Sequence, residues 1–204
     1  MKSKHWFILY VLIEQFWLLS LLNTPFYLSK QGYISDLFIR PGYEALLYRI
    51  LAIVSGIILL IFARTLHVNR SNKWYGRAVL TTKSLAVLTI IDAVFVDTCS
   101  SLIDKCQLVG MSYVSSFIHG IESIISVGLV FLLCAFIYKS RTVSRVQIVT
   151  CALLLAVILI AQLVSSQLEA DKGLWQRLFT ICAVIPFYYL LPRDRSSPRH
   201  LRES

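Results

Sequence analysis

The chain has 204 residues, of which 57% are hydrophobic and only 15% are charged, whereas about 25% of the residues of ordinary soluble proteins are charged. This composition excludes a soluble globular domain and predicts an integral membrane protein. The net charge of +9 comes from basic residues scattered over short segments, so no nucleic-acid partner is expected.

Six mostly apolar runs are long enough to cross a membrane as helices, for which about 20 residues each are needed. They occupy residues 6–23, 44–66, 77–97, 112–138, 145–166 and 174–191. Because little chain remains between them, we predict a single all-α domain over residues 1–204, a six-span helix bundle with no soluble domain.

The first run follows Lys2 and Lys4, as the apolar core of a secretory signal would. Glu14 and Gln15 interrupt it, and no small-residue cleavage site follows, so we expect the run to remain as a helix. Two roles are open for Glu14: a buried ion pair with Lys83 of the third run, or part of a proton relay.

The distribution of Lys and Arg predicts the orientation. With both termini in the cytoplasm, 13 of the 20 basic residues fall on the cytoplasmic side, as the positive-inside rule favours. These are Lys2, Lys4, Arg64, Arg70, Lys73, Arg77, Lys139, Arg141, Arg145, Arg193, Arg195, Arg199 and Arg202. The connection of residues 24–43 then lies outside, and its aromatic residues are consistent with either an interfacial belt or a lid.

Ionisable groups concentrate in the third and fourth runs, and the predicted topology brings them together in the outer half of the membrane. They are Asp92 and Asp97 in the third run and His119 and Glu122 in the fourth. One face of the fourth helix carries Ser115, His119, Glu122 and Ser126, and the third carries a similar stripe of Thr82, Thr89, Asp92 and Cys99. We predict that the two stripes face a common interior.

Basic residues occur at a similar depth, since Arg49 and Arg177 lie near the outer ends of the second and sixth runs. Charges inside a membrane are costly unless they are paired or hydrated, so we predict a polar cavity that opens outward. Its candidate ligand-binding residues are Arg49, Asp92, Asp97, Ser116, His119, Glu122 and Arg177. Purely structural pairing between helices is the alternative.

Two glycines of the fourth run, Gly120 and Gly128, lie a little over two helical turns apart. Small residues let neighbouring helices approach closely in a membrane. We therefore expect a close helix contact at these positions.

Two cysteines, Cys99 and Cys106, fall in the outer connection between the third and fourth runs, where oxidation is permitted. We predict a structural disulfide between them; a redox-active pair and two free thiols are the alternatives. The other cysteines, Cys134, Cys151 and Cys182, lie within apolar runs and are expected to be buried.

The stretch DAVFVDTC with SSFIHGIES in the third and fourth runs, and GLWQRLF at the start of the last, resembles the bacterial six-helix membrane proteins of the domain of unknown function 998. The resemblance implies a multi-pass protein of the bacterial plasma membrane, with no established activity. It also implies roles for Asp92, Asp97, Cys99, Cys106, Ser116, His119, Gln176 and Arg177. Val96 departs from the family pattern, which often has proline before the second aspartate.

The sequence contains no complete catalytic motif, and no cofactor is expected. The favoured hypothesis is a protein that binds or moves a membrane lipid or small amphiphile in its cavity. One alternative is a metal-dependent membrane hydrolase that uses Asp92, His119 and Glu122. Another is a structural or assembly subunit with a protein partner that the sequence does not identify.

Overall fold

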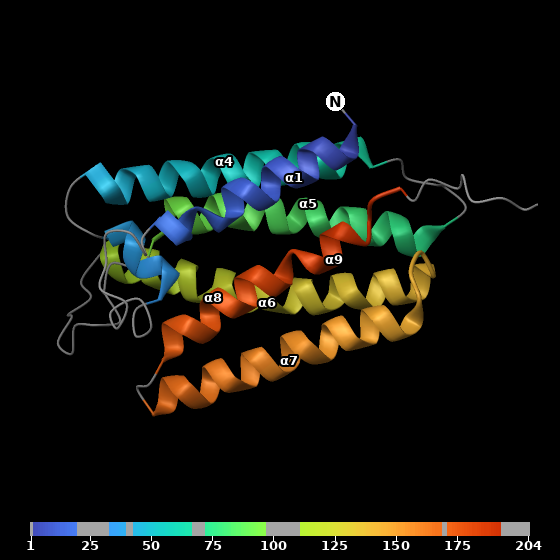
Figure 1. Ribbon diagram of the computed structural model, residues 1–204. Helices are drawn as coiled ribbons and strands as arrows, with labels where there is room; N and C mark the ends of the chain where they lie inside the picture. Colours follow the sequence, from blue (N-terminus) through green and yellow to red (C-terminus); the bar gives the residue numbers. More distant parts are fainter. Residues whose placement is uncertain are drawn as a thin grey trace, which may run out of the picture.

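The computed structural model describes residues 2–19, 33–39, 43–66, 72–96, 111–168 and 171–192 (Figure 1). Its helices are α1 (Ser3–Glu14), η1 (Gln15–Leu19), η2 (Ile34–Ile39), α4 (Tyr43–Thr65), α5 (Lys73–Val94), α6 (Met111–Ser140), α7 (Arg145–Gln167), α8 (Lys172–Ala183) and α9 (Ile185–Tyr188). No strand occurs in the described ranges. The predicted all-α class is confirmed.

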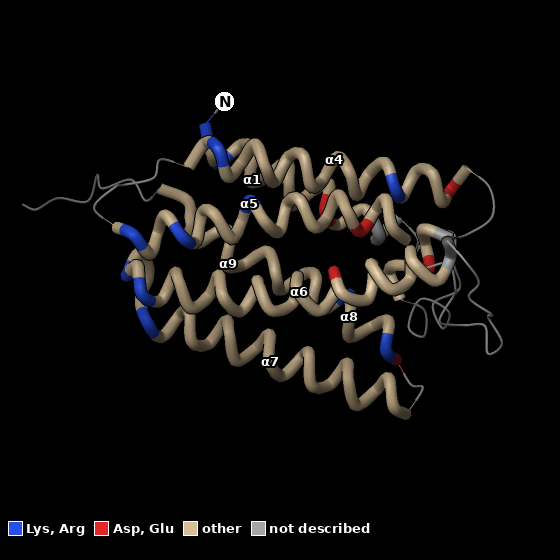
Figure 2. The backbone as a smooth tube through the Cα atoms, turned by 180° about the vertical axis from the view of Figure 1, so that it is seen from behind, with Lys and Arg blue, Asp and Glu red and all other residues tan. Residues whose placement is uncertain are grey.

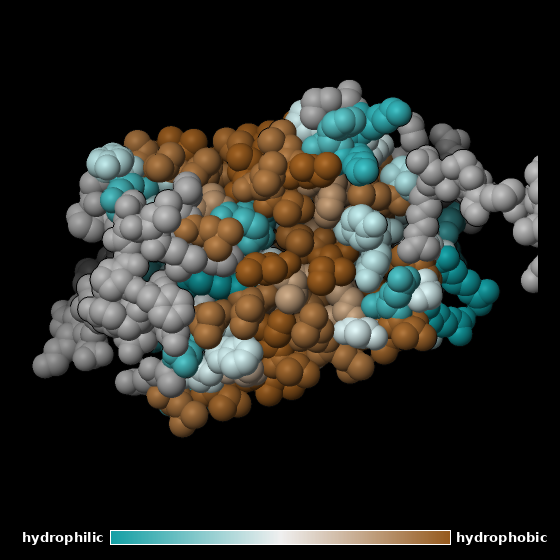
Figure 3. Space-filling view, in the orientation of Figure 1, coloured by the Kyte–Doolittle hydropathy of each residue, from teal (hydrophilic) through white to brown (hydrophobic). Residues whose placement is uncertain are grey.

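The long helices lie side by side in one bundle, in which α1 packs on α4, α4 on α5, α5 on α6 and α7 on α8. Three segments are long and apolar enough to cross a membrane on their own: Tyr43–Thr65, Tyr113–Ser140 and Arg145–Gln167. Large apolar side chains cover the outside, as in Figure 3, and Ile124 is 76% exposed. Lipid is the environment that suits such a surface, and the chain is a membrane protein.

Basic residues gather at one end of the bundle, where α5 and α7 begin and α6 ends (Figure 2). The positive-inside rule assigns the end of a membrane protein that is richer in Lys and Arg to the cytoplasm. The cytoplasmic orientation of the termini and the six crossings stay predictions.

The first and last predicted runs are each divided in two. The α-helix of the first ends at Glu14 and continues as the 3₁₀ segment η1; the 12 and 5 residues together span about 28 Å, close to the thickness of the hydrocarbon core. The last run breaks between α8 and α9 because Pro186 has no N–H to continue the helical ladder.

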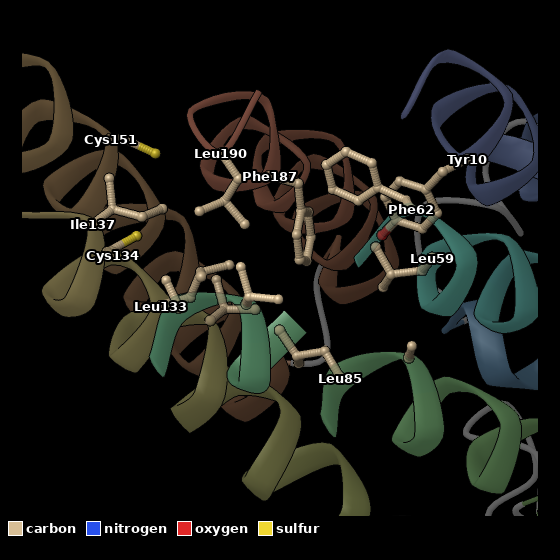
Figure 4. Close-up of a cluster of buried hydrophobic side chains, with 14 of the residues drawn as sticks. Tyr10, Leu59, Phe62, Leu85, Leu133, Cys134, Ile137, Cys151, Phe187 and Leu190 are labelled. Carbon is tan, nitrogen blue, oxygen red and sulfur yellow. The ribbon is translucent and has the colours of Figure 1, made fainter. Parts of the chain in front are cut away.

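The larger apolar cluster lies in the half of the bundle nearer the basic end, and Figure 4 shows part of it in close-up. The short helix α9 inserts Phe187 between the long helices. Its ring packs edge-on against that of Tyr10, with the two ring centroids 5.6 Å apart. Phe62 and Leu133 beside it are fully buried. The opposite half of the bundle holds a smaller apolar cluster, which includes Phe16, Phe38 and Tyr48, and a cavity with a partly polar wall.

Close approach of helices occurs at Gly56, not at the two glycines of the fourth run. A Cβ on Gly56 would lie 2.8 Å from the carbonyl oxygen of Ala86 and 2.7 Å from Cγ1 of Ile90, both on α5. Gly120 and Gly128 have open space around them, so the expectation of close packing there is wrong. The sequence pattern missed Gly56 because a single glycine in an apolar run carries no periodic signal.

Replacing Gly56 with alanine is therefore expected to destabilise the protein by about 1–3 kcal/mol, because a backbone carbonyl cannot move aside as a side chain can. Gly128→Ala, which adds the same methyl group in open space, is the control and should be no less stable than the natural protein. Thermal unfolding of both variants in one detergent checks this. Equal destabilisation of both would contradict the close α4–α5 contact.

Candidate functional site

A cavity of about 260 Å³ lies in the half of the bundle away from the basic end, and every helix except α9 contributes to its wall. Its polar lining residues are Glu14, Ser35, Thr89, Asp92, His119, Glu122, Ser123, Ser126, Gln162, Gln176 and Thr180. Phenylalanine and aliphatic side chains complete the wall: Phe16, Ile34, Phe38, Ala52, Val127, Leu159 and Phe179. Hydrophilic atoms show between the helices towards this end in Figure 3.

The centre of the cavity is a cluster from α5 and α6. Asp92 Oδ1 lies 2.6 Å from His119 Nδ1, and the two side chains are 25% and 14% exposed. Glu122, one turn beyond His119, is buried and accepts a hydrogen bond from the Ser126 hydroxyl. Metal-ligating atoms of Asp92, His119 and Glu122 all lie within 4.8 Å of one another. Of the two predicted polar stripes, Thr89 and Asp92 of one and His119, Glu122 and Ser126 of the other line this cavity together. Thr82 and Ser115 donate to backbone carbonyls instead, and Cys99 lies outside the described residues.

A third carboxylate reaches the cavity from α1. Glu14 is the last residue of that helix, and the Ser55 hydroxyl of α4 donates a hydrogen bond to it. The described contacts of Glu14 do not include Lys83, so the predicted ion pair between them is not formed. Glu14 follows the buried Tyr10 by four residues, so both lie on the face of α1 that is turned into the bundle.

The short helix η2 forms part of the cavity wall and is attached at both ends. Its first amide, on Ile34, donates to Gln176 Oε1 of α8 over 2.6 Å. Near its end, the Phe38 carbonyl oxygen accepts two hydrogen bonds from Arg49 of α4, one from Nε at 2.9 Å and one from Nη2 at 2.7 Å. This fork fixes η2 against the bundle and is specific to arginine geometry.

The chain can now be compared with known proteins. The model of the family described as Protein of unknown function (DUF998) matches residues 7–191, which covers the whole bundle. The chain belongs to this family. No curated protein and no solved structure gives a significant match.

The DUF998 bundle brings some of the predicted site residues together and leaves others outside. Asp92, His119 and Glu122 line the cavity, whereas Arg49 holds η2 and Ser116 lies on α6 away from the lining. Arg177 is buried and donates to the Gly173 carbonyl of its own helix at 2.9 Å. The sequence placed both arginines at the depth of the acids, but depth alone does not show whether an arginine lines a cavity or donates to a backbone carbonyl, as Arg49 and Arg177 do.

Three predicted residues, Asp97, Cys99 and Cys106, lie outside the described residues, and the disulfide between the two cysteines stays a prediction. Free thiols occur at Cys134, Cys151 and Cys182. Cys134 and Cys151 are buried, as expected from their apolar surroundings, whereas Cys182 is only partly buried.

Glu14 and Gln162 are cavity residues that the sequence did not assign to the site, although both are polar groups inside apolar runs of this DUF998 chain. Gln176, singled out by the family resemblance, lines the cavity and also holds η2. Each of these three residues is a polar side chain within a predicted membrane span, and that position alone could have indicated a place in the cavity.

Arg49→Lys is expected to loosen η2, because an ammonium group cannot reproduce the two-pronged contact with Phe38. Loss of one hydrogen bond, about 1 kcal/mol, should raise amide exchange over residues 34–39 about fivefold. Exchange measured by mass spectrometry checks this, with Arg64→Lys at the far end of α4 as the control. Unchanged exchange in the Arg49 variant would mean that the fork does not hold η2.

Proposed function

We propose that this DUF998 protein binds, and as a transporter moves, a small amphiphile whose head group is positively charged. The carrying observation is the charge of the cavity wall: Glu14, Asp92 and Glu122 line it, and none of the described lining residues is Lys or Arg. Among the described lining residues, His119 is the one basic side chain. A cationic head group would neutralise the negative charge of these carboxylates.

Energetics favour such a ligand. A carboxylate at membrane depth costs a few kcal/mol unless it is paired, hydrated or protonated. The sequence suggested arginines as the partners, but Arg49 donates to a backbone carbonyl instead. The cavity wall offers an ammonium group both carboxylates and the rings of Phe16, Phe38 and Phe179, with which cation–π attraction would add to binding.

The size and the mixed lining indicate a head group with a short apolar body. The volume of about 260 Å³ lies just below the range of about 300–1,000 Å³ that is usual for small-molecule pockets. Val127 and Leu159 offer apolar contacts to such a body. Location in a bacterial plasma membrane, with the cavity facing outward, completes the proposal.

The test uses three probes that share one chain length and differ in charge: hexylamine, hexanol and hexanoate. Purified protein in a neutral detergent is titrated with each, and thermal stability is followed. Stabilisation by hexylamine alone supports the proposal, because ligand binding to the folded state raises its stability. Equal shifts with hexanol, or a larger shift with hexanoate, would refute a cation site.

Metal-dependent hydrolysis is the second candidate, and the 4.8 Å grouping of Asp92, His119 and Glu122 favours it. Three ligands with room for water are the pattern of catalytic zinc sites. Titration with Zn²⁺ in the same assay separates the two candidates. Stoichiometric, chelator-reversible stabilisation by Zn²⁺ that His119→Gln abolishes, without an effect of hexylamine, would favour the hydrolase.

A further inference from the structure

Three basic side chains converge on one indole ring at the basic end of the bundle, far along the helices from the cavity. Lys139 Nζ lies 4.4 Å from the centroid of the Trp74 ring, Arg77 Cζ lies 4.7 Å from it and Lys73 Nζ lies 5.3 Å from it. Lys73, Trp74 and Arg77 belong to the start of α5, and Lys139 to the last turn of α6. Two helices thus build one cationic cluster.

The base of this cluster is held in place by polar and aromatic contacts. The Asn72 side chain accepts from the Tyr75 amide at 3.1 Å and donates to the Ser140 carbonyl at 3.0 Å, which ties the start of α5 to the end of α6. Trp74 packs on Phe136 with ring centroids 6.0 Å apart. The indole is therefore a fixed platform, so little conformational freedom is lost when a ligand binds to it.

No acid of the described ranges balances the charges of the cluster. In the described part of the chain, Lys73, Arg77 and Lys139 form no ion pair with a carboxylate, and all three are exposed. The ring offers each cation a modest attraction, but three like charges around it repel one another. Lys73 also lies in the first turn of α5, where the helix dipole disfavours a cation. An anion between the three groups would remove this repulsion.

We propose that Lys73, Arg77, Lys139 and Trp74 bind the phosphate of an anionic phospholipid at the membrane interface. Tryptophan and basic residues at the ends of membrane helices are suited to the head-group region. The exposed face of α5 continues from Lys73 and Arg77 to Leu80, which is 63% exposed, and to Val87 further along the helix. Leu132 is exposed about two turns before Lys139 on α6. These apolar faces give the acyl chains a surface directly beside the phosphate site.

The experiment compares delipidated full-length protein with added phosphatidylglycerol, phosphatidylcholine or inorganic phosphate, using native mass spectrometry and thermal unfolding. The natural protein should retain phosphatidylglycerol in preference to phosphatidylcholine and be stabilised by it. The variant K73Q/R77Q/K139Q should bind phosphatidylglycerol about tenfold more weakly or worse, since each basic residue near an anionic lipid contributes about 1 kcal/mol. Its unfolding without lipid checks that the variant is folded.

The control K4Q/R64Q/R145Q removes the same number of charges from exposed positions of described helices outside the cluster. It should lose less than half of the preference for phosphatidylglycerol. Equal losses in both triple variants would overturn the proposal, because a diffuse surface charge would then explain the binding. Stabilisation by inorganic phosphate equal to that by the lipid would also overturn it.

Discussion

Glu122→Gln is expected to weaken the binding of hexylamine by at least about 30-fold, which corresponds to ~2 kcal/mol. Glu122 is the most buried acid of the central cluster, and losing one partner of a buried charge pair costs about 2–5 kcal/mol. The glutamine keeps the shape and can still accept from Ser126. Without ligand, the variant should be at least as stable as the natural protein, because it removes repulsion from nearby Asp92.

Asp171→Asn is the matched control, since it removes one negative charge from an exposed position at the start of α8. Its affinity for hexylamine should change less than twofold because exposed charges interact weakly across water. Isothermal titration with hexylamine measures all three proteins. An unchanged dissociation constant in the Glu122 variant would contradict its role as the counter-charge.

His119→Gln should destabilise the protein, and the additional change Asp92→Asn should recover part of the loss. Asp92 Oδ1 and His119 Nδ1 are 2.6 Å apart, so removing His119 leaves the Asp92 carboxylate beside Glu122 without its imidazole partner. Breaking a fully buried pair costs about 3–5 kcal/mol. Because a quarter of the Asp92 side chain is exposed in the structure, we expect about 2 kcal/mol.

A double-mutant cycle in mixed micelles, with the free energy of unfolding as the readout, measures the coupling directly. A coupling of at least about 1 kcal/mol is expected for side chains in contact. The pair Asp92 and Arg49 serves as the reference, because the structure joins Arg49 to the Phe38 carbonyl. Additivity of Asp92 and His119 within about 0.5 kcal/mol would contradict the contact between them.

The composition and the helical periodicity predicted the parts of this molecule that depend on regular helices. A long apolar run has one stable form in a membrane, so α4, α6 and α7 begin and end within two residues of their predicted limits. The spacing of His119, Glu122 and Ser126 places them on one helix face whatever the tertiary structure is. Their meeting with Asp92 then followed from the antiparallel order of α5 and α6.

Features that depend on irregular backbone or on a single long side chain could not be predicted in this way. The segment η2 forms part of the cavity wall because two distant side chains, Gln176 and Arg49, hold it. Arg49 carries the same charge whether it lines a cavity or donates to a carbonyl. Only the three-dimensional arrangement separates these two roles.

Mapping of a photoreactive hexylamine analogue on the protein tests the central claim most directly. The account predicts residue-level labelling at cavity positions such as Ser123, Ser126 and Thr180, suppressed by excess hexylamine and absent in the Glu122→Gln variant. Labelling restricted to exposed apolar residues of α7, such as Leu153 and Val157, and unaffected by hexylamine, would show partitioning into the surrounding detergent or lipid. That result would contradict a cation-binding cavity.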